Sequence, residues 1–512
     1  MFDLPDEDAA LHARVCVIGS GFAGAIVAVE LARAGIDVLV LEAGSADPDH
    51  RLEGMLDRVD APGRSELRFG FSRQLGGASN LWAGRLATLE PIDLEARDWV
   101  PYSGWPLSWD DLAPYFARAA EILGVPTAHD DVALPEFLAG PRLDLKFFQW
   151  ASSPFHAGRH LTHAALGSHH LRVVTNAPVV ELLEREDARS VEAALVARPG
   201  GGRLRVGAEV FVIAAGGIQT PRLLLSSTSV RAHGIGNDHG VVGRFLSTHP
   251  KANMATVVTT RPVGTRHPLF TDHATGDGIL RCGVGFSHDA QRAFRLLNHY
   301  VQVLPFWEHR ANRLFEAVRG SRAFNSPLID RSPLISGFLP GAGKIAFEMM
   351  GRLGGVQRRA RGFVLRAFLD QYPNPENRVT LSEKKDEDGM PLANLAWHFS
   401  PDDRASVLAF FATLSDELKA RGLARLDYRR LRDTEDWPLI GIHSHYMGTT
   451  RMGEDAGTSV TNGDCRVHGS ENVFVAGPSL FPSYGHANPV HTVAALALRL
   501  ADHARRKLAG EQ

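Results

Sequence analysis

A glycine-rich turn between a short strand and a helix constrains this chain more than any other feature. Residues 14–18 are apolar and largely β-branched, which predicts a buried strand, and residues 25–34 form an apolar helical segment. The turn between them carries glycine at Gly19, Gly21 and Gly24. In such a turn the first glycine permits the tight bend, the second lets a pyrophosphate approach the backbone, and the third allows close helix–strand packing. The pattern predicts a dinucleotide-binding βαβ unit.

An acidic residue closes the second strand of this unit. Residues 37–41 are again apolar, and Glu42 follows them, 18 residues after Gly24. A carboxylate at this place accepts hydrogen bonds from ribose hydroxyls and repels a 2′-phosphate. Strand, helix and carboxylate in register make the motif far more specific than the glycines alone. The motif does not separate NAD from FAD, so both stay open at this point.

The composition excludes several classes of function. The chain has 55 Lys and Arg against 58 Asp and Glu, a balance that argues against a nucleic-acid-binding protein. Its three cysteines, Cys16, Cys282 and Cys465, are an odd and sparse set, which indicates no disulfide framework and gives no zinc-binding spacing. The chain has no long apolar run and starts with acidic residues, so we expect no transmembrane helix, no signal peptide and a cytoplasmic location.

The length of 512 residues favours more than one core. A strand at 472–477 and a helix at 489–504 have the character of the first unit, so the C-terminus is expected to return to it. We therefore predict an α/β fold, α+β overall, with two domains. The first is a Rossmann-like domain assembled from residues 1–250 and 440–512, and the second is an inserted substrate domain at 251–439 with an antiparallel sheet and helices.

The remaining predicted elements lie between these segments. One buried strand at 210–217 ends in glycines, and the helix after it is expected to start with Thr220 as cap and Pro221 at its first position. Further predicted strands cover residues 171–183, 191–196, 378–382 and 395–399, and a further predicted helix covers 112–123.

A basic run distinguishes the middle of the chain. Residues 310–366 contain eleven Lys and Arg but only three acidic residues. We interpret this run as a solvated, partly helical excursion. The alternative is a basic lid, an oligomer or partner contact, or a membrane-surface patch.

Several segments along the chain carry a family resemblance, and the most specific lies near the C-terminus. It reads HYMGT at 445–449 and, about forty residues later, NPVHT at 488–492. The other matching segments are residues 15–44, 76–82, 214–226, 240–250 and 374–382. Together they resemble the glucose–methanol–choline (GMC) oxidoreductases, which oxidise alcohols by passing a hydride to FAD. The resemblance implies FAD as the cofactor in preference to NAD.

The resemblance implies two catalytic residues, His445 in the H-x-x-G-T position and Asn488. Elementary chemistry supports this pair, because alcohol oxidation requires removal of the O–H proton as the C–H hydride leaves. A neutral imidazole accepts that proton near neutral pH, and an amide N–H stabilises the developing alkoxide without adding charge. His486 is the replacement candidate if Asn488 has no such role, and it is also expected to line the flavin pocket.

The resemblance also implies a cofactor site spread over the whole chain. Leu81 stands where pyranose oxidases of the family carry a histidine bonded to the flavin, so we expect the FAD to be non-covalent. Val179 is expected to contact the adenine through its backbone. The implied FAD-binding residues are Gly19, Gly21, Phe22, Ala23, Gly24, Glu42, Gly77, Ser79, Asn80, Val179, Ala215, Gly477, His486, Asn488, Pro489 and Thr492.

The expected reaction is the oxidation of a hydroxyl group of a sugar, glycoside or polyol, with Gln371, His445 and Asn488 contacting the substrate. Oxygen, a quinone or a redox protein would accept the electrons. Oxidation of a sterol or aliphatic alcohol, a redox-silent flavin lyase, a docking function of the basic run and an NAD-dependent dehydrogenase are the alternatives. His443 and His445 could also bind a metal, but no third ligand is evident, so we predict no metal site.

Overall fold

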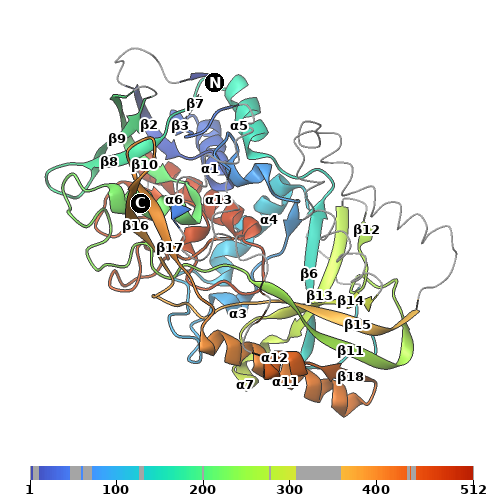
Figure 1. The fold of residues 1–512 in the computed structure, drawn as a ribbon. Helices are drawn as coiled ribbons and strands as arrows, with labels where there is room; N and C mark the ends of the chain where they lie inside the picture. Colours follow the sequence, from blue (N-terminus) through green and yellow to red (C-terminus); the bar gives the residue numbers. More distant parts are fainter. Residues whose placement is uncertain are drawn as a thin grey trace, which may run out of the picture.

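The computed structural model describes residues 2–3, 11–46, 59–60, 72–125, 132–198, 201–275, 278–306, 359–434, 437, 439 and 445–510. Within these residues the strands form two eight-stranded sheets and one three-stranded sheet. The two large sheets lie at opposite ends of the molecule, with helices α4 (Trp109–Leu123) and α13 (Val490–Ala509) between them (Figure 1). The mixed α/β fold agrees with the sequence-based expectation.

The first sheet contains the predicted βαβ unit. Its strand order is β1-β7-β3-β2-β10-β9-β8, and β19 pairs with β10. The pairings of β2 with β3, β2 with β10 and β10 with β19 are parallel, whereas β8, β9 and the start of β10 pair in antiparallel fashion. The strands are β1 (Phe2–Asp3), β2 (Leu11–Ile18), β3 (Val38–Leu41), β7 (Leu171–Thr175), β8 (Val179–Glu184), β9 (Val191–Ala197), β10 (Arg203–Ile213) and β19 (Val473–Val475).

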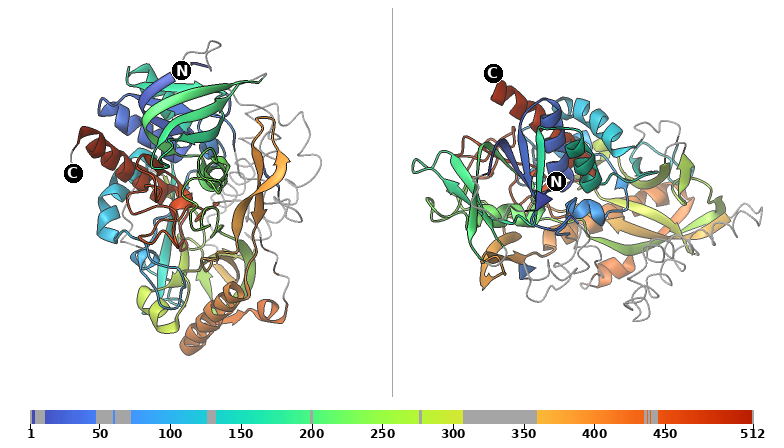
Figure 2. Two further views of the ribbon diagram at one scale, coloured as in Figure 1. Left: turned by 90° about the vertical axis from the view of Figure 1, so that its left-hand side faces the viewer. Right: turned by 90° about the horizontal axis from the view of Figure 1, so that it is seen from above.

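Apolar helices cover this sheet. Helix α1 (Phe22–Arg33) is buried along nearly its whole length and packs against α13, α5 (Ala157–Leu166) and strand β3. A helix that is apolar on all sides has to be buried in this way. The C-terminal helix α13 therefore completes the layer that the N-terminal unit begins, as the sequence predicted, and Figure 2 shows the two helices adjacent in both views.

The second sheet is antiparallel, in the order β18-β11-β15-β14-β13-β6-β5, with β12 paired to β13. Long helix α11 (Pro401–Arg421) packs on one face, together with the core around Phe363 and Phe410, while Lys146, Phe148 and Tyr300 lie on the other face. The strands are β5 (Arg85–Leu86), β6 (Leu143–Ala151), β11 (Lys251–Gly264), β12 (His273–Thr275), β13 (Gly278–Phe286), β14 (Tyr300–Pro305), β15 (Arg359–Phe368) and β18 (Ala424–Asp427).

A small third sheet and short elements connect the two large ones. The sheet has the order β16-β17-β4 and packs against helix α6. Its strands are β16 (Arg378–Lys385), β17 (Pro391–Ala396) and β4 (Val59–Asp60), and the remaining helices are α3 (Pro91–Leu94), α6 (Gly216–Ser226), α7 (His288–Phe294), α12 (Arg429–Asp433), η2 (Gly77–Asn80) and η3 (Pro478–Leu480).

A buried ion pair joins α6 to the hairpin between β16 and β17. Arg222 Nη2 lies 2.5 Å from Asp386 Oδ2, and the two side chains are 2% and 1% exposed. Arg222 Nε also donates to the Pro391 carbonyl, 2.6 Å away. Asp386 Oδ1 in turn accepts from the backbone N–H groups of Asp388 and Met390, each at 3.0 Å. Both charged groups therefore form hydrogen bonds with protein groups, which offsets the cost of removing the two charges from water.

Three sequence-based element predictions were wrong. Helix α6 begins at Gly216 and not at Pro221. Pro221 lacks the N–H that would bond the Gly217 carbonyl, and the hydroxyl of Thr449 donates to that carbonyl instead, at 2.6 Å. The predicted strand at 171–183 is divided at Asn176, whose φ of 53° breaks the extended conformation. Finally, residues from Arg359 onward form strand β15 and no helix.

Residues 310–358 of the predicted basic excursion lie outside the described residues. Strands β5 and β6 belong by sequence to the segment predicted for the cofactor domain, yet they pair within the second sheet. We keep the two-domain division as a proposal, with these strands assigned to the substrate domain. No helix in the described part of the chain has the length and apolar character needed to cross a membrane.

Candidate functional site

The glycine-rich loop between β2 and α1 allows very close backbone packing. Gly19 adopts a φ of 103°, a region that favours glycine, and a Cβ there would lie 2.7 Å from the Ala214 carbonyl oxygen. A Cβ on Gly24 would lie only 2.0 Å from the Gly19 carbonyl oxygen. Side chains at either position would therefore push helix α1 away from the sheet.

Gly21 has a different environment, because a Cβ there would meet no atom within 4 Å. It is the N-cap of α1, and no side chain caps this end of the helix. The first N–H groups of a helix have no intrahelical partner, and the helix dipole favours negative charge beside them. The open space at Gly21 and the uncapped helix end thus fit a diphosphate group.

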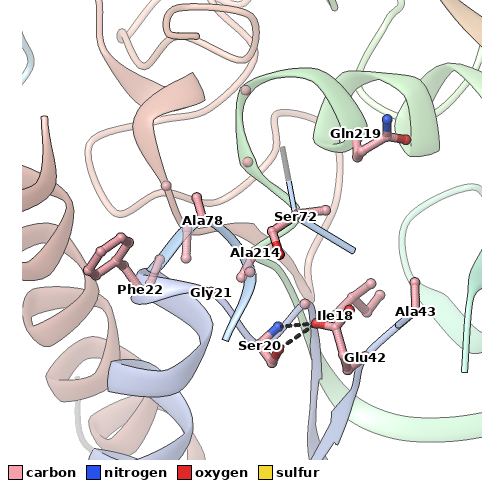
Figure 3. Close-up of a pocket in the computed structure, with 18 of the residues that line it drawn as sticks. Ile18, Ser20, Gly21, Phe22, Glu42, Ala43, Ser72, Ala78, Ala214 and Gln219 are labelled. Carbon is pink, nitrogen blue, oxygen red and sulfur yellow. Dashed lines mark hydrogen bonds between the residues drawn. The ribbon is translucent and has the colours of Figure 1, made fainter. Parts of the chain in front are cut away.

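Glu42 lies buried beside this loop at the end of β3. Its Oε2 accepts from the Ser20 N–H at 3.1 Å and from the Ser20 hydroxyl, and its Oε1 accepts from the Gly44 N–H at 2.8 Å. Figure 3 shows Ser20 and Glu42 joined in this way at the pocket wall. Burial raises the pKa of Glu42, while these hydrogen bonds oppose that effect.

Ser20 is a site residue that sequence reasoning missed. Its hydroxyl also accepts from the Gly76 N–H at 2.9 Å, so one side chain joins β3, the glycine loop and the segment before η2. Ser20 occupies a variable position of the glycine motif, and the motif alone gives no signal for this role.

The loop opens into a cavity of about 310 Å³. The wall includes segments near both ends of the chain and from its middle, as expected for a cofactor site assembled from distant segments. The predicted residues that line it are Gly19, Gly21, Phe22, Ala23, Glu42, Gly77, Val179, Ala215, His445, Gly477 and Pro489. Gly24, Ser79, Asn80, Gln371, His486, Asn488 and Thr492 do not line this cavity.

Several predicted residues outside the cavity wall support its structure. The Ser79 hydroxyl donates to the Gly76 carbonyl at 2.7 Å and accepts from the Ala157 N–H at 3.0 Å. Asn80 donates to the Leu75 carbonyl at 3.1 Å. Thr492 is fully buried in the first turn of α13.

Gln371 is predicted to contact the substrate, but the structure buries it among protein groups. Its Oε1 accepts from the Trp397 indole N–H at 3.2 Å, and its Nε2 donates to Asp403 at 3.4 Å. The side chain is only 2% exposed, so it is not presented to the cavity that His445 lines.

His445 lies at the cavity wall in an unusual backbone conformation, with a φ of 64°. Its Nδ1 is 3.3 Å from Nδ1 of His249, a residue that the sequence analysis did not consider. Burial lowers the pKa of His445 well below its usual range, and the nearby His249, Lys251 and Arg85 lower it further. A neutral imidazole at neutral pH is the form that can accept a proton.

Asn488 is half-buried and directly precedes Pro489, which lines the cavity. No hydrogen bond from its amide to any described residue is found, in contrast to Ser79 and Asn80. Its amide group is thus available for an external partner. His443, the other histidine considered for a metal site, lies outside the described residues.

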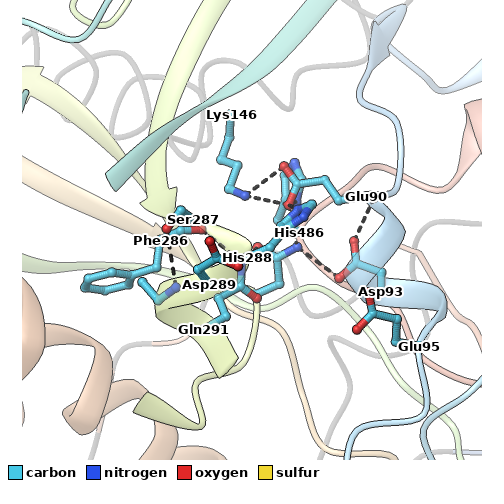
Figure 4. A network of polar contacts seen from close by, with 12 residues as sticks. Glu90, Asp93, Glu95, Lys146, Phe286, Ser287, His288, Asp289, Gln291 and His486 are labelled. Carbon is cyan, nitrogen blue, oxygen red and sulfur yellow. Dashed lines mark hydrogen bonds and ion pairs between the residues drawn. The ribbon is translucent and has the colours of Figure 1, made fainter. Parts of the chain in front are cut away.

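His486 belongs to a buried polar network on the second sheet (Figure 4). Its Nδ1 lies 4.0 Å from Glu90 Oε2, and burial lowers its pKa to about 3. Lys146 Nζ donates to both Glu90 oxygens, at 2.7 and 2.5 Å. Burial alone would raise the pKa of Glu90, but Lys146 above all holds it well below its usual range.

Within the described part of the chain, Glu90, Asp93 and His486 form one group whose donor atoms lie close enough together for a metal ion. The Lys146 ammonium already supplies positive charge there. Asn298 Nδ2 donates to Glu90 at 3.0 Å and to Asp93 at 2.9 Å, so an N–H group bridges the two carboxylates. This arrangement disfavours a metal ion, which needs free carboxylate lone pairs.

Comparison with known families decides the class of enzyme. A model of FAD-dependent oxidoreductases matches residues 14–348, and a model of the GMC oxidoreductases matches residues 373–497. The chain belongs to the FAD-dependent GMC oxidoreductases. This confirms the predicted family, the FAD cofactor and the class of oxidoreductases that act on CH–OH donors. The Leu81 side chain offers no atom for a covalent bond to the flavin at this position.

Relatives of this GMC oxidoreductase match nearly its whole length. It is 25% identical to 2-methyl-1,2-propanediol dehydrogenase of Mycolicibacterium austroafricanum, over 96% of this chain and 95% of the relative. It is 26% identical to paromamine 6′-oxidase of Streptomyces fradiae, over 98% and 92%. Fructose dehydrogenase large subunit of Gluconobacter japonicus is 24% identical, over 96% and 97%.

Solved structures agree with the GMC fold. Pyridoxine 4-oxidase from Mesorbium loti aligns with a TM-score of 0.56 at 17% identity, over 96% of this chain and 99% of that one. At this level of identity the likeness shows the fold alone.

Proposed function

We propose that this GMC oxidoreductase oxidises a hydroxyl group of a sugar, glycoside or polyol to a carbonyl. The observation that carries the proposal is the place of His445, buried at the wall of the cavity that the glycine-rich loop also lines. Burial lowers the pKa of His445, which favours the neutral imidazole. The relatives support the substrate class, because they include 2-methyl-1,2-propanediol dehydrogenase, paromamine 6′-oxidase and a fructose dehydrogenase subunit.

His445 is proposed as the general base. Its Nδ1 contacts His249, so Nε2 is the nitrogen left for the substrate hydroxyl. Transfer of the O–H proton to Nε2 generates an alkoxide, whose negative charge is lost when the hydride leaves the carbon that bears this oxygen and the neutral carbonyl forms. The hydride acceptor for the adjacent C–H bond would be supplied by FAD, when it is bound. The uncapped start of α1 and Glu42 are the residues proposed to hold its diphosphate and its ribose.

Asn488 is proposed to donate a hydrogen bond to the developing alkoxide. We expect Asn488→Ala to slow flavin reduction by roughly 10²–10³-fold, because a donor aimed at the transition state is lost. Stopped-flow absorbance under anaerobic conditions measures this rate. An unchanged rate constant would exclude the role and move it to His486. Asn237→Ala is the matched control, since that amide donates to the His233 carbonyl at 2.9 Å, away from the cavity wall.

Glu42 is proposed to hold the ribose of the cofactor. We expect Glu42→Ala to weaken FAD retention, because the carboxylate also holds Ser20 and Gly44 in place around the cavity. The ratio of flavin to protein absorbance after gel filtration measures retention. Glu30→Ala in helix α1 is the control, because this carboxylate pairs with Arg33 and Arg118 and does not line the cavity. Unchanged flavin content in the Glu42 variant would contradict the ribose contact.

The substrate class is tested by adding sugars, glycosides, polyols, sterols and aliphatic alcohols anaerobically to the flavin-loaded protein. Bleaching of the flavin band by a sugar, glycoside or polyol would support the proposal. Bleaching only by sterols or aliphatic alcohols would replace it with oxidation of a non-sugar alcohol. A flavin band that none of them bleaches would favour the redox-silent lyase.

The electron acceptor, the basic run and the cellular location complete the proposed function. We propose oxygen, a quinone or a redox protein as the electron acceptor, and an oligomer, partner or membrane contact as the function of the basic run at 310–366. A cytoplasmic location is supported by three cysteines that are all buried and free.

A further inference from the structure

His249 and His445 form a contact between two elements that are 196 residues apart in sequence. The two Nδ1 atoms are 3.3 Å apart, and the rings are nearly perpendicular, at 84°. A hydrogen bond between two imidazole nitrogens needs one hydrogen atom, so one nitrogen is protonated and the other has a lone pair. The contact therefore couples the tautomers of the two rings.

The backbone holds this contact in place. The Ser247 N–H donates to the Met447 carbonyl at 3.1 Å, and the Met447 N–H donates to the Ser247 carbonyl at 3.0 Å. Each histidine lies two residues from this bridge, His249 after it and His445 before it. The φ of 64° at His445 turns its side chain out of the direction that an extended residue would give.

The buried environment of His249 favours its neutral, unprotonated form. Burial lowers its pKa to about 4, and the backbone of Gly485 offsets part of this effect. The Nε2 atom of His249 is buried and has no hydrogen-bond partner among the described residues, so its Nδ1 contact with His445 is the side-chain hydrogen bond that orients this ring. No carboxylate of the described chain hydrogen-bonds to His445, so a carboxylate does not orient this base, as it does in a Ser-His-Asp triad.

We propose that His249 accepts a hydrogen bond from Nδ1–H of His445 and thereby keeps the lone pair on Nε2, where the substrate hydroxyl is deprotonated. The reverse arrangement would place the hydrogen on Nε2 and block the base. His249 is thus a positioning residue, and this assignment rests on the proposed function of His445. No proton passes to His249 in the reaction.

The tautomer is measured by ¹⁵N NMR of histidine-labelled, FAD-loaded protein, with His445→Gln used to assign the signals of residue 445. We expect a protonated-type signal for Nδ1 and a lone-pair-type signal for Nε2 in the wild type. His249→Ala should replace them with a mixture of tautomers. A protonated Nε2 in the wild type, or signals unaffected by His249→Ala, would overturn the proposal.

Kinetics and a conservative variant separate positioning from a structural role. His249→Ala should slow flavin reduction by about 10–100-fold, the usual effect of losing a group that orients a functional side chain. His249→Asn should recover part of the rate and the wild-type tautomer, because its amide oxygen can accept the same hydrogen bond. Equal rates and tautomers in the two variants would contradict the assignment.

A second buried histidine provides the matched control. His299 is 1% exposed and bonds to Ser406 and to the Asp370 N–H, so His299→Ala removes a structural histidine. It should lower the melting temperature without changing the His445 signals. If the tautomer is as proposed but no alcohol reduces the flavin, the proposed oxidation fails while the tautomer assignment stands.

Discussion

Replacing His445 by alanine is expected to slow flavin reduction by about 10²–10⁴-fold while FAD stays bound, because the variant lacks the general base. The cavity wall loses one side chain among many, so the cofactor contacts at the glycine loop and Glu42 are retained. Anaerobic stopped-flow absorbance gives the rate, and the flavin content of the purified variant gives the occupancy. Near-normal reduction would remove His445 from the mechanism.

His491→Ala is the matched control for this experiment. Both of its ring nitrogens are used by the protein, with Nδ1 2.7 Å from the Thr88 hydroxyl and Nε2 2.9 Å from the Phe116 carbonyl. Its removal should lower stability and leave flavin reduction intact.

The pH profile of the wild type gives a further check, because the pKa of His445 lies well below the ordinary 6.5. The base form then persists below pH 6.5, so the rate should not fall as the pH decreases through that value.

Replacing Asp386 by alanine is expected to destabilise the protein by about 3–5 kcal/mol, because it leaves the Arg222 guanidinium buried without its counter-ion. Two backbone N–H groups of the same hairpin also lose their acceptor. Since Arg222 lines the cofactor cavity, FAD retention should decrease as well. Denaturant unfolding of the flavin-loaded protein measures the first effect.

The adjacent Glu387→Ala is the control for the ion pair. Glu387 is 73% exposed and bonds to Arg73 at 2.8 Å on the surface. Exposed pairs contribute about 0–1 kcal/mol, so the control should unfold close to the wild type. Equal denaturant midpoints of unfolding for the Asp386 and Glu387 variants would show that the buried pair between α6 and the hairpin does not stabilise the fold as proposed.

Much of the cofactor unit could be predicted because its signals are local. Gly19, Gly21, Gly24 and Glu42 lie within one βαβ segment, where turn geometry and strand length set their relative positions. The return of the C-terminal helix to this unit was also predictable from its apolar character. The start of helix α6 at Gly216 could not be predicted. The hydroxyl of Thr449, more than 200 residues away, donates the hydrogen bond to the Gly217 carbonyl that Pro221 cannot donate.

The sequence by itself determined the dinucleotide loop and the family, since these depend on short motifs whose chemistry does not require knowledge of distant partners. It also supplied the two residues that we propose as base and donor. Only the tertiary structure decided that His445 contacts His249, that Gln371 is enclosed by protein groups, and that β5 and β6 pair with the second sheet. Such contacts join segments far apart in the chain. Antiparallel pairing and side-chain hydrogen bonds across that distance follow from packing of the whole fold, which no local pattern encodes.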